Sequence, residues 1–393
     1  MNFEFSPQEE SFREEVKEFI RKEFPSKLRW DFGCTFTPAV QSHEGEEWEY
    51  VKAMRRKVGA KGWLSLSWPE EYGGKNSLFL QNIDFEEILY HNVPGVDHIG
   101  VTFFAPTLLR FGTEKQKRQY LPGIASGETY WCELLSEPDS GSDLASLKTL
   151  AIQDRDYYII NGQKTWNTGA HKTQMGFILV RTDSNLPRHK GLSYFMVDMD
   201  TPGITIRPII NMVGEHEFNE VFFDNVKVPK ENMVGGKTRG WSVTMMTLDF
   251  ERFSHMMYPS ICGYLDGLVE YLKQTGKSLE PFYRNQLYQL FAECEMAKMI
   301  HYRAMCIMAK GISTTYEVAI DKMYNCELAQ RAADFGIQVL GHYGELRRGS
   351  KFAPLNGWPS FYYLDAASYT MMGGTSEIDR NVIATQGLGL PVQ

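Results

Sequence analysis

The sequence predicts an α+β protein of several domains, with a β-rich block between two α-helical blocks. Apolar residues recur at helical spacing in the first and last parts of the chain, whereas short alternating or β-branched runs fill the part between them. With 393 residues, the chain is long enough for two or three domains. We therefore expect domains at 1–127, 128–236 and 237–393.

The first block consists of helical patterns and one irregular segment. Pro7 follows Ser6 at the predicted start of the first helix, which is a common arrangement at a helix N-terminus. The segment 29–46 has no clean period, which predicts a long loop or insertion. Further helical patterns cover 47–61, 78–92, 101–110 and 114–126.

The middle block contains runs typical of strands. They are TYWCELLS, DYYIINGQKTW, MGFILVRTD, GLSYFMVDM and NEVFFDNVKV, beginning at residues 129, 156, 175, 191 and 219. Asn161-Gly162 and the tripeptide 201–203 predict turns between them. Beyond these runs, long amphipathic patterns predict helices over 241–274, 281–310 and 315–341.

Composition argues against several classes of protein. The 41 basic and 49 acidic side chains give a net charge of −8, which does not favour a nucleic-acid partner. No apolar run approaches the ~20 residues needed to cross a bilayer, and the N-terminus does not resemble a secretory signal. We expect a cytoplasmic protein without membrane insertion. Aromatic residues make up 13% of the chain, so large apolar surfaces must be buried in a core, a pocket or a subunit interface.

The cysteines and histidines do not predict a metal site. The six cysteines stand singly, without Cys-x-x-Cys pairs or zinc spacing, so no disulfide framework is predicted either. The segment GEHEFNE at 214–220 places acids around His216, but it lacks the His-Glu-x-x-His spacing. We expect a solvated turn or an interface loop there, and no metal.

Two stretches of the middle block are suited to ligand binding. The loop LLSEPDSGSDLASLKT at 134–149 places hydroxyls and backbone N–H groups after a strand, where they suit carbonyls, phosphates or a polar ring edge. A solvated turn is the alternative. In NGQKTWNTGA at 161–170, a turn leads into a predicted strand with Trp166 and Thr168 on one face. That face either contacts a flat heteroaromatic ligand or contributes Trp166 to a core.

Three further stretches lie in the last block. Glu251 stands in the apolar helical pattern TLDFERFSH, at 247–255, where a carboxylate is either a general base or part of a structural salt bridge. In MMGGTSEIDRN at 371–381, two glycines precede a predicted helix start with Thr375 at its N-cap. The stretch IQVLGHYGE at 337–345 ends a helix at glycine, which is an ordinary C-cap.

Together these stretches resemble the acyl-CoA dehydrogenase family, over essentially the whole chain and in the same order. LSEPDSGSD at 135–143 is similar to a family signature, although Leu134 stands where a small residue is usual. The resemblance implies an α-helical N-terminal domain, a β-barrel-like middle domain and a C-terminal four-helix bundle. It also implies FAD, an acyl-CoA substrate and transfer of the electrons to an electron-transferring flavoprotein.

In this family a carboxylate removes the α-proton of a thioester while the β-hydride passes to the flavin, which gives a 2-enoyl-CoA. The resemblance implies that FAD contacts Leu135, Ser136, Gly141, Ser142, Trp166, Thr168, Gln338, Gly341, Thr375 and Glu377. It implies substrate contacts at Ser142, Asp249, Arg252 and Gly374. Asp97 and His98 lie in a segment that usually lines the acyl pocket, so they either meet a polar acyl tail or face solvent.

The chain departs from the family pattern in two places. Gly373 stands where many members carry the catalytic glutamate, but Glu251–Arg252 resembles the arrangement of members whose base lies on the long helix. The alternative is a subunit without catalysis, whose partner supplies the active site. The family's Arg-x-x-Phe-Gly motif is missing from 274–284, where Arg284 is the only replacement we can suggest.

These departures resemble the pimeloyl-CoA and steroid-side-chain branch of the family. That branch includes α2β2 hetero-oligomers, so the resemblance implies either such an assembly or a homodimer or homotetramer. An acyl-CoA oxidase is a third reading, although oxidases of this kind are usually longer.

Overall fold

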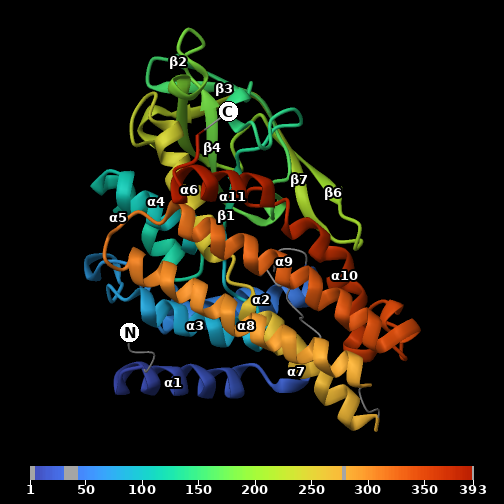
Figure 1. The fold of residues 1–393 in the computed structure, drawn as a ribbon. Coiled ribbons are helices and arrows are strands. Elements are labelled where there is room, and N and C mark those ends of the chain that lie inside the picture. Colours follow the sequence, from blue (N-terminus) through green and yellow to red (C-terminus); the bar gives the residue numbers. More distant parts are fainter. Residues whose placement is uncertain (1–4, 31–42, 277–279, 392–393) are drawn as a thin grey trace. The chain divides into compact units, whose positions relative to one another are not determined.

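The computed structural model describes residues 5–30, 43–276 and 280–391 (Figure 1). These residues form two compact units, which we describe separately. The sheet unit comprises residues 43–75 and 95–251, and the helical unit comprises residues 5–30, 76–94 and the described residues from 252 onward. Most of the predicted insertion at 29–46 lies outside the described residues.

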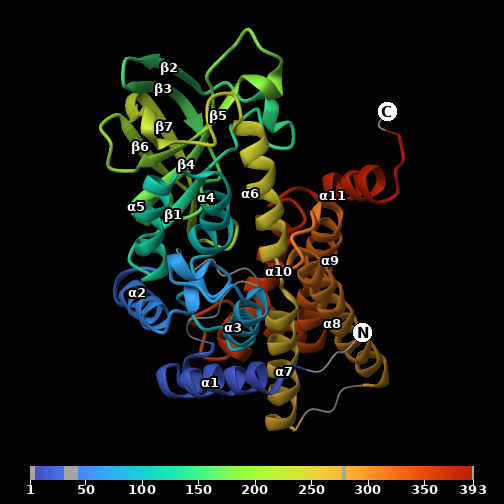
Figure 2. The same cartoon turned by 90° about the vertical axis from the view of Figure 1, so that its left-hand side faces the viewer.

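The sheet unit is built on an eight-stranded sheet with the strand order β6-β7-β3-β2-β4-β5-β8, in which β1 pairs with β4 (Figure 2). The predicted runs became β1, β3, β4, β5 and β7, whereas β2, β6 and β8 were not predicted. The strands are β1 Trp131–Leu134, β2 Leu150–Asp154, β3 Tyr157–Lys164, β4 Met175–Arg181, β5 Leu192–Asp198, β6 Ile204–Ile210, β7 His216–Pro229 and β8 Met233–Val234.

The prediction of a turn at Asn161-Gly162 is wrong, because both residues lie inside β3. The pairing of β3 with β7 shifts by one residue between Ile160 and Gly162, which marks a β-bulge. The Asn161 carboxamide oxygen accepts a hydrogen bond from the backbone N–H of Asn225 at 2.8 Å. A Cβ atom at Gly162 would lie 2.5 Å from Thr149 Oγ1, so close packing explains this glycine.

The sheet unit also contains helices. They are α2 Gly45–Ala60, α4 Ala105–Phe111, α5 Glu114–Ala125 and the part of α6 Gly240–Ser254 that ends at Glu251. A π-helical turn, Ile99–Phe104, precedes α4 where the sequence predicted one helix over 101–110. Phe104 stacks on Trp131 at 3.8 Å and on Phe177 at 5.7 Å between ring centroids, so aromatic rings join this turn to the sheet.

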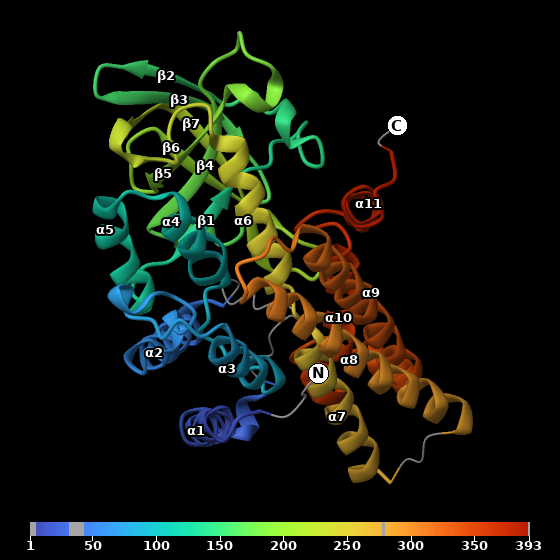
Figure 3. The same ribbon diagram turned by 60° about the vertical axis from the view of Figure 1, so that its left-hand side comes forward.

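The helical unit contains α1 and α3 together with the helices that follow α6. Ser6 and Glu9 form a capping box at the start of α1, as the Ser6-Pro7 pattern predicts for a helix start. Helices α7, α8 and α9 run side by side in Figure 3. The helices are α1 Pro7–Glu23, α3 Leu78–Tyr90, α7 Tyr258–Gln274, α8 Pro281–Met308, α9 Thr315–Leu340, α10 Trp358–Tyr369 and α11 Ser376–Val382.

The pattern over 241–274 is two helices and not one. The chain leaves the helical conformation at residues 255–257, between α6 and α7. The buried Asn325 side chain of α9 accepts hydrogen bonds from the backbone N–H groups of Met257 at 3.1 Å and Tyr258 at 2.9 Å. This side chain therefore caps α7 from another helix, a tertiary contact that local periodicity does not reveal.

Among the described residues, no helix is long and apolar enough to cross a membrane. The described cysteines Cys132, Cys262, Cys294, Cys306 and Cys326 are all free thiols. Cys34 lies outside the described residues.

Candidate active site

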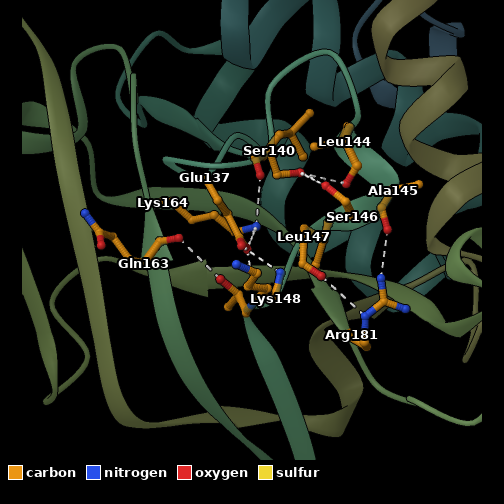
Figure 4. Close-up of polar contacts among 12 residues, drawn as sticks. Glu137, Ser140, Leu144, Ala145, Ser146, Leu147, Lys148, Gln163, Lys164 and Arg181 are labelled. Carbon is orange, nitrogen blue, oxygen red and sulfur yellow. Dashed lines mark hydrogen bonds and ion pairs between the residues drawn. The ribbon is translucent and has the colours of Figure 1, made fainter.

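A buried carboxylate fixes the loop that follows β1. Glu137 Oε1 accepts hydrogen bonds from the backbone N–H of Thr149 and from Lys164 Nζ, both at 2.9 Å (Figure 4). Glu137 Oε2 accepts from the backbone N–H of Lys148 at 2.6 Å. Lys164 Nζ also donates to the Leu135 carbonyl at 2.9 Å. The two ends of the loop are thus tied to β3 through one ion pair.

This ion pair changes the acidity of both partners. Burial lowers the pKa of Lys164 to about 8, although the attraction of Glu137 opposes that shift. Burial alone would raise the pKa of Glu137, but the attraction of Lys164 and hydrogen bonding outweigh it and leave this pKa below its usual value. Both groups are therefore charged at neutral pH.

The hydroxyl groups of the loop divide into two kinds. Ser140 Oγ donates to the Asp143 carbonyl at 2.8 Å, and Ser146 Oγ donates to Ser140 Oγ at 3.2 Å, so these serines hold the loop itself (Figure 4). Gly141 and Ser142 are exposed instead. A Cβ atom at Gly141 would meet nothing within 4 Å. The loop therefore presents an open, polar rim on a rigid base.

The segment after β3 carries an exposed aromatic ring in an unusual backbone conformation. The prediction of a strand through Trp166 and Thr168 is wrong, because β3 ends at Lys164. Trp166 has a φ of 62°, in the left-handed region, and is 60% exposed. The alternative that Trp166 belongs to a core is therefore also wrong.

Hydrogen bonds outside the β-ladder hold this segment in place. The backbone N–H of Thr165 donates to the Ser136 carbonyl at 2.9 Å, which joins the segment to the loop after β1. The backbone N–H of Asn167 donates to the Asn219 carbonyl at 3.0 Å. Asn167 Nδ2 also donates to the Glu133 carbonyl at 2.8 Å. Such contacts depend on distant residues, which explains why a local strand pattern misled the prediction.

Two glutamates lie in the sheet unit near the end of its part of α6. Glu251 is buried, with 8% of its surface exposed. Glu133 of β1 is half-buried, and its Oε1 atom is shielded from solvent without a hydrogen-bond partner among the described residues. Burial raises the pKa of Glu133 well above its usual value, and the nearby charge of Glu251 raises it further. Sequence reasoning missed Glu133; its only signal was an acid inside an apolar strand pattern.

Asp97 and His98 are buried, so the alternative that they face solvent is wrong. Asp97 Oδ2 forms an ion pair with the buried Arg55 at 3.3 Å. Burial raises the pKa of Asp97, although Arg55 and backbone N–H groups oppose the shift. This pairing explains the burial of Asp97 without a ligand, and its contact with an acyl chain stays a prediction.

In the helical unit, a buried carboxylate lies between two cations. Asp379 Oδ1 is 3.2 Å from Arg252 Nε, and Asp379 Oδ2 is 3.5 Å from Lys322 Nζ. Lys322 also donates a hydrogen bond to the Gly374 carbonyl. The position of a Cβ atom at Gly374 would lie 3.5 Å from Arg252 Nη2. This cluster fixes the Gly373–Gly374 turn, whose φ angles of 62° and 96° favour glycine.

The remaining predicted site residues of the helical unit lie at helix ends. Thr375 Oγ1 accepts a hydrogen bond from the backbone N–H of Ile378 at 3.2 Å, so Thr375 is the expected N-cap of α11. Glu377 is exposed in the first turn of this helix. Gly341 ends α9 and Gln338 is exposed in its last turn, where Gln338 Nε2 donates to Asp334 at 2.5 Å. Their contacts with FAD stay predictions, as do those of Arg284 and of the half-buried Asp249.

The fold brings three possible metal ligands together that the sequence spacing did not indicate. The side-chain ligand atoms of Glu44, His171 and His216 lie within 4.8 Å of one another. Glu44 is already paired with Lys172 at 2.9 Å. Burial, the charge of His216 and that of Lys172 lower the pKa of His171 to about 4.

The Asn219 side chain determines which nitrogen of His171 carries the proton. Asn219 Nδ2 donates to the Asn167 carbonyl at 2.9 Å, which fixes the orientation of the amide. The same nitrogen lies 3.1 Å from His171 Nδ1 and must donate to it, so His171 carries its proton on Nε2. A protonated Nε2 and a paired carboxylate describe a hydrogen-bonded network better than a set of metal ligands.

Comparison with known proteins identifies the family. Models of acyl-CoA dehydrogenases match the chain with their N-terminal domain over residues 6–128, their middle domain over 132–226 and their C-terminal domain over 238–388. The chain belongs to the acyl-CoA dehydrogenase family. Members of this family are flavin-dependent oxidoreductases, and the helical, sheet and helical order predicted from the sequence is confirmed.

Individual relatives agree with the predicted branch. The acyl-CoA dehydrogenase IpdE1 of Mycobacterium tuberculosis is 34% identical over 382 residues, covering 96% of this chain and 98% of the relative. A solved structure named Tcur3481-Tcur3483 steroid ACAD has a TM-score of 0.90 at 28% identity and covers 100% of both chains. The ChsE4-ChsE5 complex from Mycobacterium tuberculosis has a TM-score of 0.87 at 29% identity, with 100% of both chains covered.

Proposed function

We propose that this protein is an FAD-dependent acyl-CoA dehydrogenase in which Glu251 removes the α-proton of the thioester. One observation carries the proposal: a buried glutamate lies on α6 immediately before Arg252, in a chain whose usual base position is Gly373. A carboxylate withdrawn from water is more basic than one at the surface, which suits proton abstraction.

The residues of the sheet unit fit a flavin. The Trp166 ring is exposed although its backbone is held in a left-handed conformation, an arrangement that serves no core. Asn167 Oδ1 is buried without a hydrogen-bond partner among the described residues. The exposed Gly141 and Ser142 belong to the loop after β1, which an ion pair fixes and which Ser136 joins to the segment that carries Trp166. A flat heteroaromatic ring with polar edges matches this set of groups.

The mechanism assigns separate tasks to the chain's own residues. We propose that Trp166 packs against the flavin, that Ser136, Ser142 and Thr168 bind its polar edge, and that Thr375 and Glu377 bind elsewhere along FAD. When bound, the flavin supplies the acceptor for the β-hydride. The Gly374 N–H would polarise the thioester oxygen, which lowers the barrier to removal of the α-proton by Glu251.

Three further assignments belong to this proposal. An electron-transferring flavoprotein is the expected electron acceptor. We also propose domains at 1–127, 128–236 and 237–393, which lie close to the ranges that the three family models match. We propose a steroid-type acyl substrate, because two similar structures are named as forms of the Tcur3481-Tcur3483 steroid ACAD.

The test is the substitution Glu251→Gln. The purified variant should stay yellow and bind acyl-CoA, because the amide keeps the size of the side chain. Its turnover in an α,β-desaturation assay should fall by roughly 10³-fold, since proton transfer loses its base. Glu128→Gln, at an exposed position of the same unit, is the matched control and should retain activity. Undiminished turnover of Glu251→Gln would remove Glu251 from the mechanism.

A second candidate function is a half-site subunit of a heteromeric dehydrogenase. It is favoured by the similar structures whose titles name two chains, Tcur3481-Tcur3483 and ChsE4-ChsE5. In that case the purified chain should be colourless and inactive, and it should acquire FAD and activity when it is co-expressed with its partner. A yellow, active homo-oligomer, measured by light scattering and absorbance together, would exclude it.

A further inference from the structure

The two faces of β1 have different chemistry. Cys132 and Leu134 point into the apolar core of the sheet, in a cluster with Ile178 and Phe195. Because side chains alternate along a strand, Trp131 and Glu133 lie on the opposite face. Glu133 pairs in register with Phe177 of β4, whose ring belongs to the aromatic stack on that second face.

Helix α6 approaches the sheet where the helix begins. A Cβ atom at Gly240, where α6 begins, would lie 2.6 Å from the backbone of Ser193 in β5. Thr247 Oγ1 lies 3.0 Å from Thr107 Oγ1 of α4, and both side chains are buried. Thr244, Thr247 and Glu251 follow one another at helical spacing, so they share one side of α6.

Several polar atoms in this region are shielded from solvent without partners. Glu133 Oε1, Trp131 Nε1 and Thr244 Oγ1 make no hydrogen bond with the described residues. Leaving such an atom unpaired destabilises the folded protein. Of the three, Glu133 Oε1 belongs to the residue whose charge interacts with Glu251, so a bound acyl group is a suitable source for its partner.

Glu133 differs in its surroundings from Asp97 and Glu137, two buried carboxylates of this unit. Arg55 accompanies Asp97, and Lys164 accompanies Glu137. The groups that act on Glu133 are burial and the like charge of Glu251, and they raise its pKa. Both influences favour the protonated form of this carboxyl, and a protonated carboxyl is a hydrogen-bond donor.

We propose that Glu133 donates a hydrogen bond to an oxygen atom on the acyl group, and that the substrate is therefore an oxygenated acyl-CoA and not a plain alkyl one. This inference rests on the proposed function, because Glu251 marks the α-carbon of the acyl chain. An alkyl chain would leave the Glu133 carboxyl unpaired, whereas a ketone or hydroxyl oxygen would satisfy it. Sites that hydrogen-bond a substrate group discriminate strongly against analogues that lack it.

The experiment compares octanoyl-CoA with its 4-, 5-, 6- and 7-oxo analogues, which differ only in one oxygen. Wild-type holoenzyme and the variants Glu133→Leu and Glu133→Gln are assayed for kcat/KM. Glu133→Gln retains a hydrogen-bond donor, whereas Glu133→Leu removes it at similar volume. Glu128→Leu makes the same chemical change at an exposed position of the sheet unit and is the control.

In the wild type and in Glu133→Gln, we expect kcat/KM for at least one oxo analogue to exceed kcat/KM for octanoyl-CoA by roughly tenfold or more. In Glu133→Leu this ratio should fall to about one, while Glu128→Leu keeps it. The proposal is overturned if the wild type turns over octanoyl-CoA and prefers no analogue, or if Glu133→Leu keeps the ratio. The proposal is also overturned if Glu133→Leu shifts the pH profile of kcat but leaves the ratio of kcat/KM values unchanged, because Glu133 would then act on Glu251 and not on the substrate.

A binding measurement separates this proposal from the proposed function. Dissociation constants for the same acyl-CoAs, measured by calorimetry, do not require turnover. If no acyl-CoA is oxidised but the oxo analogue binds tighter to the wild type than to Glu133→Leu, the dehydrogenase assignment fails and the role of Glu133 stands. Equal affinities in both proteins overturn the role of Glu133 whatever the activity.

Discussion

Asp379 in the helical unit and Glu133 in the sheet unit are both carboxyl groups withdrawn from water, but only Asp379 has cations beside it. Arg252 and Lys322 approach Asp379 within 3.2 and 3.5 Å. Burial raises the pKa of Asp379 and these two cations oppose the rise. For Glu133, burial and Glu251 act in the same direction. A paired carboxylate holds a turn together, whereas an unpaired carboxyl keeps a proton that it can share with a ligand.

The largest change in the free energy of unfolding is expected when Arg252 and Lys322 lose the carboxylate of Asp379. Asp379→Asn leaves Arg252 and Lys322 buried beside a neutral amide, and breaking a buried ion pair typically costs about 3–5 kcal/mol. We expect the free energy of unfolding, measured by chemical denaturation, to fall by this amount. Asp334→Asn, at an exposed position of α9, should change it by less than about 0.5 kcal/mol. If the two variants were equally stable, the pairing of Asp379 with Arg252 and Lys322 would not stabilise the fold, and Asp379 would not differ from Glu133 in this respect.

The ion pair between Lys164 and Glu137 allows a test of whether paired charges also stabilise the sheet unit. Lys164 has a pKa of about 8 in the folded protein, below the value of 10.5 for an ordinary lysine. Between these values the unfolded chain binds more protons, so this group makes the free energy of unfolding rise with pH. The stability gap between the wild type and Lys164→Met should widen by roughly 1–3 kcal/mol from pH 8 to pH 10.5.

The control for that titration is Lys148→Met, because Lys148 is exposed in the same loop. Its stability gap to the wild type should stay constant over the same pH range. A gap that is independent of pH for Lys164→Met as well would mean that Lys164 keeps its ordinary pKa in the folded protein.

The effect of Glu133→Gln on the free energy of unfolding should be opposite in sign to that of Asp379→Asn. The pKa of Glu133 is raised on folding, so the folded protein holds a proton that the unfolded chain releases as pH rises above the ordinary glutamate value. Glutamine avoids this loss, so the variant should be more stable than the wild type at neutral pH. The gain should vanish near pH 4, where Glu133 is protonated in both states.

Denaturation of both proteins across this pH range measures the prediction. A loss of stability in Glu133→Gln at neutral pH, comparable to that of Asp379→Asn, would show that Glu133 is an ionised structural carboxylate. The proposal of a substrate contact would then lose its donor.

Much of the architecture followed from local patterns. The helices over 281–308 and 315–340 lie close to the predicted ranges, and the first helix begins at the predicted Pro7, because long amphipathic patterns and caps such as Ser6 act within one segment. The break between α6 and α7 was missed, because it depends on the Asn325 side chain of another helix. The unpredicted β6 and β8 are edge strands of the sheet, where one neighbour suffices and the sequence pattern is weaker.

The candidate site was predicted in part. Short motifs indicated Glu251, the loop at 134–149 and the turn before α11, because each motif is continuous in sequence. The burial of Asp97 depends on Arg55, and the conformation of Trp166 depends on contacts with Ser136 and β7, so neither was visible locally. Glu133 escaped notice for the same reason: an absent partner can be recognised only when the neighbours in space are known.

The bulge between β3 and β7 determines where residues can be inserted into or deleted from β7. Along β7, residues 217, 219, 221 and 223 are buried, and after the bulge the buried positions are 226 and 228. The parity of inward-facing positions changes from odd to even at the exposed pair 224–225. Deleting one of these two residues would leave a single exposed residue between Phe223 and Val226, so regular alternation would keep Val226 and Val228 facing inward and would remove the bulge. Inserting one residue there while the bulge persists would instead turn Val226 and Val228 outward. The strand therefore tolerates the loss of a residue at a point where it does not tolerate a gain.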